Sequence, residues 1–483
     1  MFFVSLLKIL SILLSIIGLV FWLPLGVAIY YGETEVYGDF VIPMIISFVF
    51  MIIVNLFTRK HKFTMNTKQT FLVVALAWLS VSIMGALPLY TTGYYPTFID
   101  ALFESVSGFT TTGATVLGNL EGLPISINLW RCETHWLGGM GVVTLTVALM
   151  PLLGVGGFQL IKAETTGPEK GKVTARITTT AKVLWGIYAG LTVIQTIALC
   201  IAGMGFVDAL AHSFATLGTG GFSPKNASVG TYNSVAIDYI CTLFMFLSGI
   251  NFSLYYYILI GKFSDVKNNS ELKAYFGLTL FFIVAVTLSL RSVYGSFWNS
   301  LRYSSFQVVS LMTTTGFATA DYVTWPPVAQ FWLFLVYFIG GCSGSTGGGI
   351  KVVRWVILGK QLHNETRKML HPHGVFSIRL NGNVTRKELV PTVGAFIMLY
   401  LILVLATTFV GCLGGVDPWS SFTGSLSMVG NVGPAFGAYG PTCNYGFLPP
   451  FVKLWYSFAM LAGRLELYTM MIYFMPAFWK RRG

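Results

Sequence analysis

Ten long apolar stretches dominate this sequence of 483 residues. An α-helix needs about 20 predominantly apolar residues to cross the hydrocarbon core of a bilayer, and each stretch comes within a few residues of that length or exceeds it. Helices and closed barrels are the two structures that satisfy every backbone hydrogen bond inside lipid. The pattern predicts an all-α polytopic membrane protein with spans at residues 8–31, 40–57, 70–89, 126–149, 184–203, 235–260, 275–290, 328–358, 390–413 and 449–475.

The composition agrees with a membrane location. Hydrophobic residues make up 54 % of the chain and charged residues only 10 %, whereas about 25 % of the residues in a soluble domain are charged. Disordered, collagen-like and coiled-coil chains are excluded too, because they are more polar or more repetitive. In a soluble protein the net charge of +12 would suggest nucleic-acid binding. In a membrane protein it marks the cytoplasmic side, so we expect no nucleic-acid partner.

The basic residues are distributed unevenly along the chain. Of the 30 Lys and Arg residues, 24 lie in the N-terminal segment, in four loops and in the C-terminal tail. Because cytoplasmic loops of membrane proteins are enriched in Lys and Arg, we expect these loops and both termini to be cytoplasmic. The four loops are residues 58–68, 159–182, 261–273 and 351–387.

Four shorter apolar segments lie between the long ones, at residues 98–109, 206–217, 298–312 and 419–429. Each is too short to cross a bilayer and ends in a glycine-rich turn, so we expect it to enter and leave by the outer face. The chain then repeats one unit four times: a span, a half-helix, a turn and a second span. The predicted division is an N-terminal helix pair at 1–68, followed by repeats at 69–158, 159–262, 263–370 and 371–483.

The four turns share a pattern in which a glycine follows the half-helix. Glycine permits positive φ, so that consecutive carbonyls can point the same way, and non-helical backbone at membrane depth must be buried in protein or line a watery path. One such turn would favour tight helix packing, but four in register predict rings of carbonyl oxygens that bind a dehydrated cation. The turns are Thr110, Thr111, Thr112, Gly113 and Ala114; Leu217, Gly218, Thr219, Gly220 and Gly221; Thr313, Thr314, Thr315, Gly316 and Phe317; and Gly430, Asn431, Val432, Gly433 and Pro434, aligned on Gly113, Gly220, Gly316 and Gly433.

A second glycine-rich segment, residues 340–351, interrupts the eighth long stretch. Six glycines fall within residues 340–349, and each costs a helix about 1 kcal/mol relative to alanine, so we expect the helix to break inside the membrane. A break beneath the turns would obstruct the pore and act as a gate. The expected gate residues are Gly344, Ser345, Thr346, Gly347, Gly348, Gly349 and Lys351, together with Arg464 of the last span.

Two enzymatic interpretations of this segment fail. Residues 341–344 fit a G-x-S-G pattern, but a serine nucleophile needs a histidine base within hydrogen-bond reach, and the histidines near membrane depth, His135 and His212, lie toward the outer side. A phosphate-binding loop requires lysine directly after its last glycine, whereas Ile350 separates Gly349 from Lys351. We therefore expect no enzymatic activity.

Several charged residues lie within the apolar segments. A charge inside a membrane is costly and suggests a function by default, so Arg464 either forms a positive barrier in the pore and binds carbonyls of the glycine-rich segment, or makes a structural ion pair. Glu104, Arg131, Glu133 and His135 lie toward the outer side. They either attract cations or pair structurally at the outer interface. His135 could also serve proton coupling, or be a histidine whose hydrogen bonds are satisfied within the protein.

The glycine turns, the half-helices and the glycine-rich segment together resemble the Trk/Ktr/HKT superfamily of potassium transporters, most closely its bacterial TrkH-type subunits. The resemblance covers nearly the whole chain. It implies four M1–P–M2 units, similar to those of potassium channels and arranged with pseudo-four-fold symmetry. It also implies one pore per chain, K⁺ as the ligand of the filter, no organic cofactor, and a homodimer in the bacterial cytoplasmic (inner) membrane.

The resemblance also bears on gating and on partners. It implies that residues 340–351 are an intramembrane gating loop and that a cytoplasmic nucleotide-binding regulator of RCK type (TrkA-like) works with the chain. The basic loop 351–387 is then a docking face, although attraction to anionic lipid also explains its charge.

The fourth turn departs from the family pattern because it has Asn431 and Val432 in place of threonines, so we expect backbone coordination there. The main alternative function is an alternating-access symporter of K⁺ with H⁺ or Na⁺.

Overall fold

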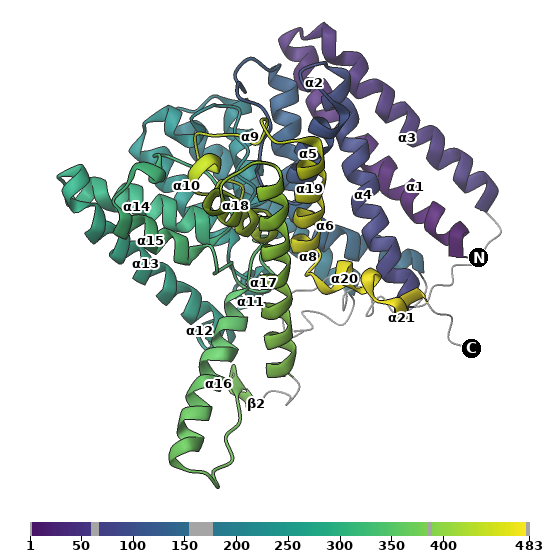
Figure 1. Ribbon diagram of the computed structural model, residues 1–483. Helices are drawn as coiled ribbons and strands as arrows, with labels where there is room; N and C mark the ends of the chain where they lie inside the picture. Colours follow the sequence, from purple (N-terminus) through teal and green to yellow (C-terminus); the bar gives the residue numbers. More distant parts are fainter. Residues whose placement is uncertain (1, 59–66, 154–176, 385–388, 480–483) are drawn as a thin grey trace.

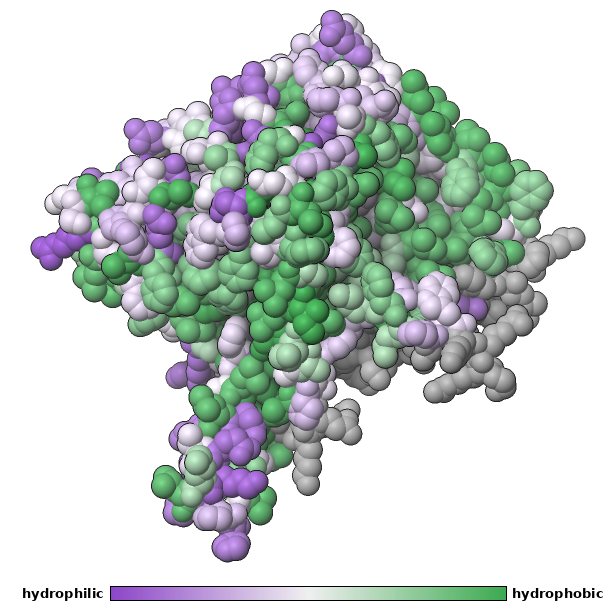
Figure 2. All heavy atoms as spheres, in the orientation of Figure 1, coloured by the Kyte–Doolittle hydropathy of each residue, from purple (hydrophilic) through white to green (hydrophobic). Residues whose placement is uncertain are grey.

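The computed structural model describes residues 2–58, 67–153, 177–384 and 389–479. In this part of the chain the structure is helical apart from one antiparallel hairpin of two short strands, β1 (Arg379–Leu380) and β2 (Asn383–Val384). Apolar side chains cover the visible flanks over α3 (Tyr37–Thr58) and α17 (Leu389–Leu413), whereas hydrophilic side chains gather at the upper rim and on the projecting end of α16 (Val352–Leu370) (Figure 2). An apolar belt between polar ends is what a bilayer requires.

The N-terminal helices form a separate pair on one side of the bundle (Figure 1). The first member consists of α1 (Phe2–Val20) and α2 (Trp22–Tyr31), and the second is α3, which follows the short turn η1 (Thr34–Val36). A Cβ on Gly18 of α1 would lie 2.0 Å from Oγ of Ser47 in α3. The absence of a side chain at Gly18 therefore allows the two helices to pack closely, as small residues do in membranes.

The remaining helices form four copies of one arrangement, in which a long helix, a half-helix, a turn and a second helix follow one another. The first repeat has α4 (Thr67–Thr91), α5 (Phe98–Phe109) and α6 (Ile125–Leu153); the second α8 (Ile177–Ile201), α9 (Phe206–Leu217), α10 (Val235–Ser248) and α11 (Phe252–Leu259); the third α13 (Ser270–Tyr294), α14 (Phe297–Met312), α15 (Pro327–Val336) and α16; the fourth α17, α18 (Pro418–Gly430) and α19 (Pro450–Arg464). Figure 1 shows α5 and α18 near the middle of the bundle, whereas α14 begins at its left edge.

The half-helices begin and end within one residue of the predicted bounds. Local signals explain this agreement, because side-chain caps start two of the helices. Thr97 Oγ1 accepts the backbone N–H of Asp100 at 3.2 Å, and Asp417 Oδ1 accepts that of Ser420 at 2.9 Å. Such caps satisfy the N–H groups that the first turn of a helix leaves unpaired.

The long spans follow the prediction less closely. Within the described ranges, six helical segments are long and apolar enough to cross a membrane: Phe3–Tyr31, Thr34–Thr58, Phe71–Thr91, Lys182–Ile201, Ser270–Tyr294 and Leu389–Leu413.

Three of the ten predicted spans are broken. The stretch 235–260 bends by 91° between α10 and α11, where the Asn251 side chain caps α11. The stretch 328–358 is divided by the glycine-rich segment. The last stretch stops being one helix at Arg464, after which come the short elements α20 (Tyr468–Met471), η5 (Ile472–Phe474) and α21 (Pro476–Trp479). The glycines of residues 340–349 predicted the second of these breaks. Hydropathy does not reveal the other two, because polar groups that neighbouring helices satisfy do not interrupt an apolar stretch.

Four of the six basic residues outside the predicted cytoplasmic segments form ion pairs. Two of these pairs join neighbouring repeats: Lys453 of α19 lies 2.6 Å from Asp100 of α5, and Arg302 of α14 lies 2.6 Å from Asp238 of α10. Removing one partner of a buried pair leaves an uncompensated charge, which is strongly destabilising. The other two pairs are Arg131–Glu104 at 2.7 Å and Lys225–Asp208 at 3.3 Å.

The Lys453–Asp100 pair gives a test of how the first and fourth repeats are joined. We expect Lys453→Ala to lower the free energy of unfolding by about 3–5 kcal/mol, because it leaves the Asp100 carboxylate buried without its cation. Lys225→Ala is the matched control. The Lys225 side chain is 31 % exposed, and surface pairs contribute about 1 kcal/mol or less. Thermal unfolding in detergent measures both losses, and equal losses would contradict this role of Lys453.

Candidate functional site

The four turns that follow the half-helices contact one another in a closed ring. Each turn has a glycine whose missing side chain leaves room for a carbonyl of the next turn, and the fourth turn returns to the first. A Cβ at these glycines would lie 2.0 Å from the carbonyl oxygen of Gly220 (for Gly113), 2.1 Å from that of Thr315 (for Gly221), 2.1 Å from that of Val432 (for Gly316) and 2.4 Å from that of Thr112 (for Gly433).

Each half-helix ends in a Schellman motif, in which a residue of positive φ closes the helix and the next N–H bonds back to the carbonyl five residues earlier. The positive-φ residue is usually glycine, but here it is Thr111, Thr219, Thr314 or Asn431, with φ between 54° and 59°. Threonine rarely adopts this conformation, and strained backbone clusters at functional sites. The closing bonds are Thr112 to Ser107, Gly220 to Ala215 and Thr315 to Ser310, each 2.8 Å, and Val432 to Ser427, 2.9 Å.

The backbone corrects the sequence alignment of the second turn. Two residues after the strained position, the equivalent glycines are Gly113, Gly221, Gly316 and Gly433, with φ of 80°, 79°, 82° and 98°. The sequence alignment placed Gly220 at this position and was wrong by one residue. The second turn contains two adjacent glycines, and only the backbone conformation shows that Gly220 instead corresponds to Thr112.

The side chains of the turns do not share the four-fold pattern of the backbone. In the first turn the hydroxyls of Thr110 and Thr112 are 2.8 Å apart, and the third turn repeats this contact between Thr313 and Thr315. The second and fourth turns have glycine or valine at these positions. The paired hydroxyls therefore occur in alternate turns around the ring.

Asn431 connects the fourth turn to the first. Its Nδ2 donates to Thr112 Oγ1 at 3.0 Å and to the Met460 carbonyl at 2.9 Å. Both hydrogen bonds of this amide nitrogen are made within the protein. Its Oδ1, the atom that could coordinate a cation, is buried and has no hydrogen-bond partner among the described residues.

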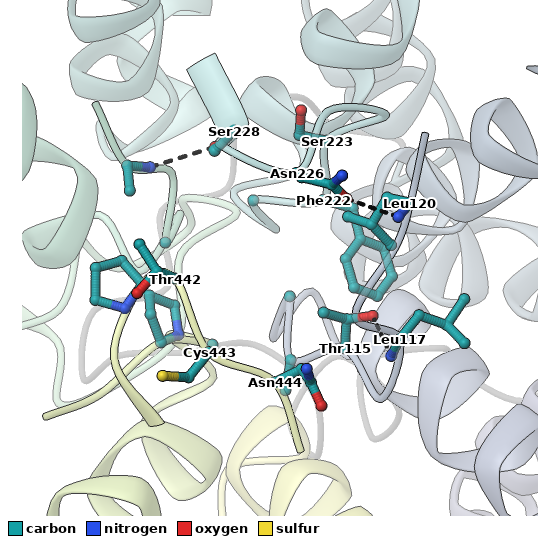
Figure 3. Close-up of a pocket in the computed structure, with 18 of the residues that line it drawn as sticks. Thr115, Leu117, Leu120, Phe222, Ser223, Asn226, Ser228, Thr442, Cys443 and Asn444 are labelled. Carbon is teal, nitrogen blue, oxygen red and sulfur yellow. Dashed lines mark hydrogen bonds between the residues drawn. The ribbon is translucent and has the colours of Figure 1, made fainter. Parts of the chain in front are cut away.

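A hollow opens on the side of the ring formed by the loops that follow the turns (Figure 3). All four positive-φ glycines line it, and polar side chains surround its mouth. Asn226 accepts the N–H of Leu120 at 2.7 Å, and Ser228 accepts that of Ala318 at 3.3 Å. Figure 3 shows Asn226 and Ser228 across the hollow from Thr442, Cys443 and Asn444. A hydrated cation can approach the ring by this route.

Three of the four residues that the sequence places toward the outer side, Glu104, Arg131 and His135, make contacts within the protein. Glu104 pairs with Arg131 and also accepts the Thr115 hydroxyl at 2.9 Å and the Val116 N–H at 3.0 Å. His135 Nδ1 accepts the Phe222 N–H at 3.3 Å, and its ring stacks on that of Phe222. For Glu104 and Arg131 these contacts favour the structural interpretation. Glu133 Oε2 and His135 Nε2 are buried and have no hydrogen-bond partner among the described residues, so for these two residues both interpretations stay open.

The glycine-rich segment lies directly beneath the third and fourth turns. The Gly348 N–H donates to Thr314 Oγ1 at 2.6 Å, so the segment is bonded to a turn. A Cβ on Gly347 would lie 2.9 Å from the Thr313 carbonyl oxygen, and one on Gly348 would lie 2.4 Å from that of Gly430. Side chains at these positions would force the segment and the ring apart.

The segment also fills the break between α10 and α11. The Cys342 N–H donates to the Gly249 carbonyl at 2.8 Å, and the Phe252 N–H donates to the Gly344 carbonyl at 3.0 Å. The Thr346 hydroxyl donates to the Ser248 carbonyl at 3.3 Å. The bend in the second repeat thus supports the broken helix of the third.

Arg464 connects the segment to the first repeat. Its guanidinium donates to the Thr346 carbonyl at 2.7 Å and to the Gly138 carbonyl of α6 at 2.9 Å. Lys351 donates to the Gly347 carbonyl within the segment. Through Thr346 and Arg464, all four repeats meet beneath the ring.

Comparison with known proteins identifies the family. The model of the TrkH family, described as a cation transport protein, matches residues 38–292 and 279–481. The Trk system potassium uptake protein TrkH of Halomonas elongata is 39 % identical over 484 residues, which cover 98 % of this chain and 99 % of that protein. The chain belongs to the TrkH family of cation transport proteins. This is a family of transporters and not of enzymes, as the sequence predicted.

The structural comparison agrees. The crystal structure of the potassium transporter TrkH from Vibrio parahaemolyticus matches with a TM-score of 0.88 and 33 % identity, covering 99 % of this chain and 100 % of that one. The TrkH of Escherichia coli K12 is 40 % identical over 428 residues, or 87 % of this chain and 88 % of that protein. The predicted fold of four M1–P–M2 repeats after an N-terminal pair is confirmed, and the chain is a multi-pass membrane protein.

The sequence missed two sets of residues that the structure brings to the site. Gly138 in α6 and Gly249 after α10 contact the turns or the glycine-rich segment through their backbones. Glu271, at the start of α13, accepts the Ser343 N–H at 2.6 Å. A buried carboxylate beside an apolar span was the one signal that could have drawn attention to Glu271.

Proposed function

We propose that this chain conducts K⁺ selectively across the cytoplasmic membrane through a single pore, in the direction of uptake. The observation that supports the proposal is the closed ring of four turns, in which a backbone carbonyl of each repeat lies against the turn of its neighbour. Such rings replace the hydration shell of K⁺. Relatives of similar length are named potassium uptake proteins, which supports K⁺ as the cation.

The proposed filter combines the ring with the half-helices behind it. Four helices end at the ring, and the C-terminal end of a helix carries about half a negative charge, so together they stabilise a cation there. The proposed filter residues are those of the four predicted turns, with Gly221 rather than Gly220 at the position of Gly113, Gly316 and Gly433, and the repeats keep their predicted bounds.

Residues 340–351 form the proposed gate. The segment lies between the ring and the cytoplasmic side, and its contacts with α10, α14, α18 and Arg464 hold it across the path of the ion. Arg464 adds a positive charge below the filter. Two unit charges 4 Å apart repel by about 4 kcal/mol at an effective dielectric constant near 20, and about 1.4 kcal/mol changes a rate tenfold.

The cytoplasmic side offers a surface for a regulator. Helix α16 extends from the gate beyond the bundle (Figure 1), and its basic residues continue into the β-hairpin. We propose that a nucleotide-binding partner of RCK type (TrkA-like) docks here, that two chains form a homodimer, and that both termini lie on this side.

Single-channel recordings separate this channel-like function from symport of K⁺ with H⁺ or Na⁺, because only a channel gives unitary currents far above transporter turnover.

The filter is tested by adding a side chain to the ring. We expect alanine at Gly113, Gly221, Gly316 or Gly433 to reduce selectivity for K⁺ over Na⁺ or to abolish flux, because the new Cβ would meet a carbonyl of the next turn. The measurement is flux of K⁺, Rb⁺, Cs⁺, Na⁺ and Li⁺ into liposomes. Gly118→Ala is the control, because Gly118 lines the same hollow but its Cβ would have only an ordinary contact at 3.4 Å. Unchanged selectivity in all four variants would refute the filter.

The gate is tested by shortening the segment. Removing Gly344–Gly349 should raise flux without any regulator, because the obstruction beneath the ring is then gone. Selectivity should largely persist, since the filter lies above the deletion. A folded variant that conducts no faster than the unmodified protein would show that the segment is not the gate.

Arg464→Ala tests the charge and the carbonyl contacts together. We expect basal flux to rise several-fold, because both the repulsion of K⁺ and the hydrogen bonds to Thr346 and Gly138 are lost. Arg464→Lys keeps the charge but has fewer donors. Its basal flux should therefore lie between that of the unmodified protein and that of Arg464→Ala. Flux per folded protein is measured beside the melting temperature, and a fall in both would indicate a structural role.

A further inference from the structure

Glu271 makes contacts that hold both ends of the glycine-rich segment. It is the second residue of α13 and is buried. Its Oε1 accepts the backbone N–H of Ser343 at 2.6 Å, the hydroxyl of Ser343 at 3.0 Å and the backbone N–H of Val353 at 3.2 Å. One carboxylate oxygen therefore receives three donors from two places in the chain.

These two places flank residues 344–351 of the proposed gate. Ser343 precedes Gly344, and Val353 lies in the first turn of α16, after Lys351. Hydrogen bonds to an ionised acceptor are about twice as strong as neutral ones, and the N-terminus of α16 also favours a negative charge. Because the same oxygen holds both ends, the segment between them is confined to a closed loop against α13.

The residue before Glu271 contacts the cytoplasmic hairpin. The Ser270 N–H donates to Asn381 Oδ1 at 2.8 Å, and the Asn381 N–H donates to Ser270 Oγ at 3.3 Å. Asn381 lies in the turn between β1 and β2, and Lys360 of α16 donates to the Arg379 carbonyl of β1 at 2.5 Å. Helix α16 thus leads away from the gate, and the hairpin that follows it folds back to contact the start of α13.

We propose that Glu271 is a positioning residue that latches the gating loop beneath the filter, and that the hairpin sets this latch through Ser270. The inference rests on the proposed gate. Because Ser270 and Glu271 are adjacent, a movement of the hairpin moves the carboxylate away from Ser343 and Val353 together. Both ends of the loop are then released from one point on the cytoplasmic side.

The test uses the full-length protein in liposomes, with Rb⁺ flux and hydrogen–deuterium exchange of residues 340–353 as two separate measurements. Glu271→Ala should increase exchange in this segment and raise basal flux by up to about tenfold. Glu271→Gln should change both less, because its amide oxygen still accepts hydrogen bonds. Asn381→Gly should act in the same direction, since glycine tolerates the positive φ of this position, 50°, and removes the contact with Ser270.

Glu33→Ala is the matched control. Glu33 accepts the N–H of Ile125 at 2.6 Å and the N–H and hydroxyl of Ser126 at 3.1 and 2.5 Å, so it binds the start of α6 much as Glu271 binds the start of α16. It has no contact with the loop, and its removal should leave both measurements unchanged.

The combination with the loop deletion decides between outcomes. In the variant that lacks Gly344–Gly349, Glu271→Ala should raise flux no further, whereas a general loss of stability would act in both backgrounds. If the deletion raises flux but Glu271→Ala changes neither exchange nor flux, the latch is refuted and the gate stands. If Glu271→Ala increases exchange but neither it nor the deletion changes flux, the proposed gate is refuted.

Discussion

The carbonyl groups at the ends of the four half-helices impose the main constraint on this structure. In a bilayer an unsatisfied backbone group costs several kcal/mol, and the last turn of every helix leaves such carbonyls. Here four helices end at the middle of the bundle and not at its surface. The long helices around these ends exclude lipid from them. In the Schellman motifs, N–H groups of the turns donate to carbonyls in the last turn of each half-helix.

Glycine makes this arrangement possible because it permits both positive φ and close approach. The second helices of the repeats reach the turns through glycines as well: a Cβ on Gly138 would lie 1.9 Å from the Phe109 carbonyl oxygen, and one on Gly463 would lie 2.1 Å from that of Val429. The ring is therefore bounded by backbone on several sides. Close-packed interiors have low compressibility, so the turns hold one another in place.

The repeats share a backbone pattern but have different roles. The first and third supply hydroxyl pairs, the second supplies the bend that receives the glycine-rich segment, and the third supplies the segment itself. The fourth supplies Asn431 and Arg464, which connect it to the first repeat. A chain with four non-identical repeats can build the proposed gate from one repeat, whereas four identical subunits would contribute four copies of it.

The sequence by itself determined the membrane fold, the four repeats and the bounds of the half-helices, because apolar length, capping residues and glycine-rich turns are local signals. It also indicated where the helix of the third repeat breaks. Only the tertiary structure decided that Gly221 and not Gly220 belongs to the ring, that α10 and α11 meet at a sharp bend, and that Arg464 and Glu271 contact the glycine-rich segment. These features depend on contacts between residues that are often 70 to 330 positions apart, and hydropathy and spacing carry no information about which backbone groups such residues meet.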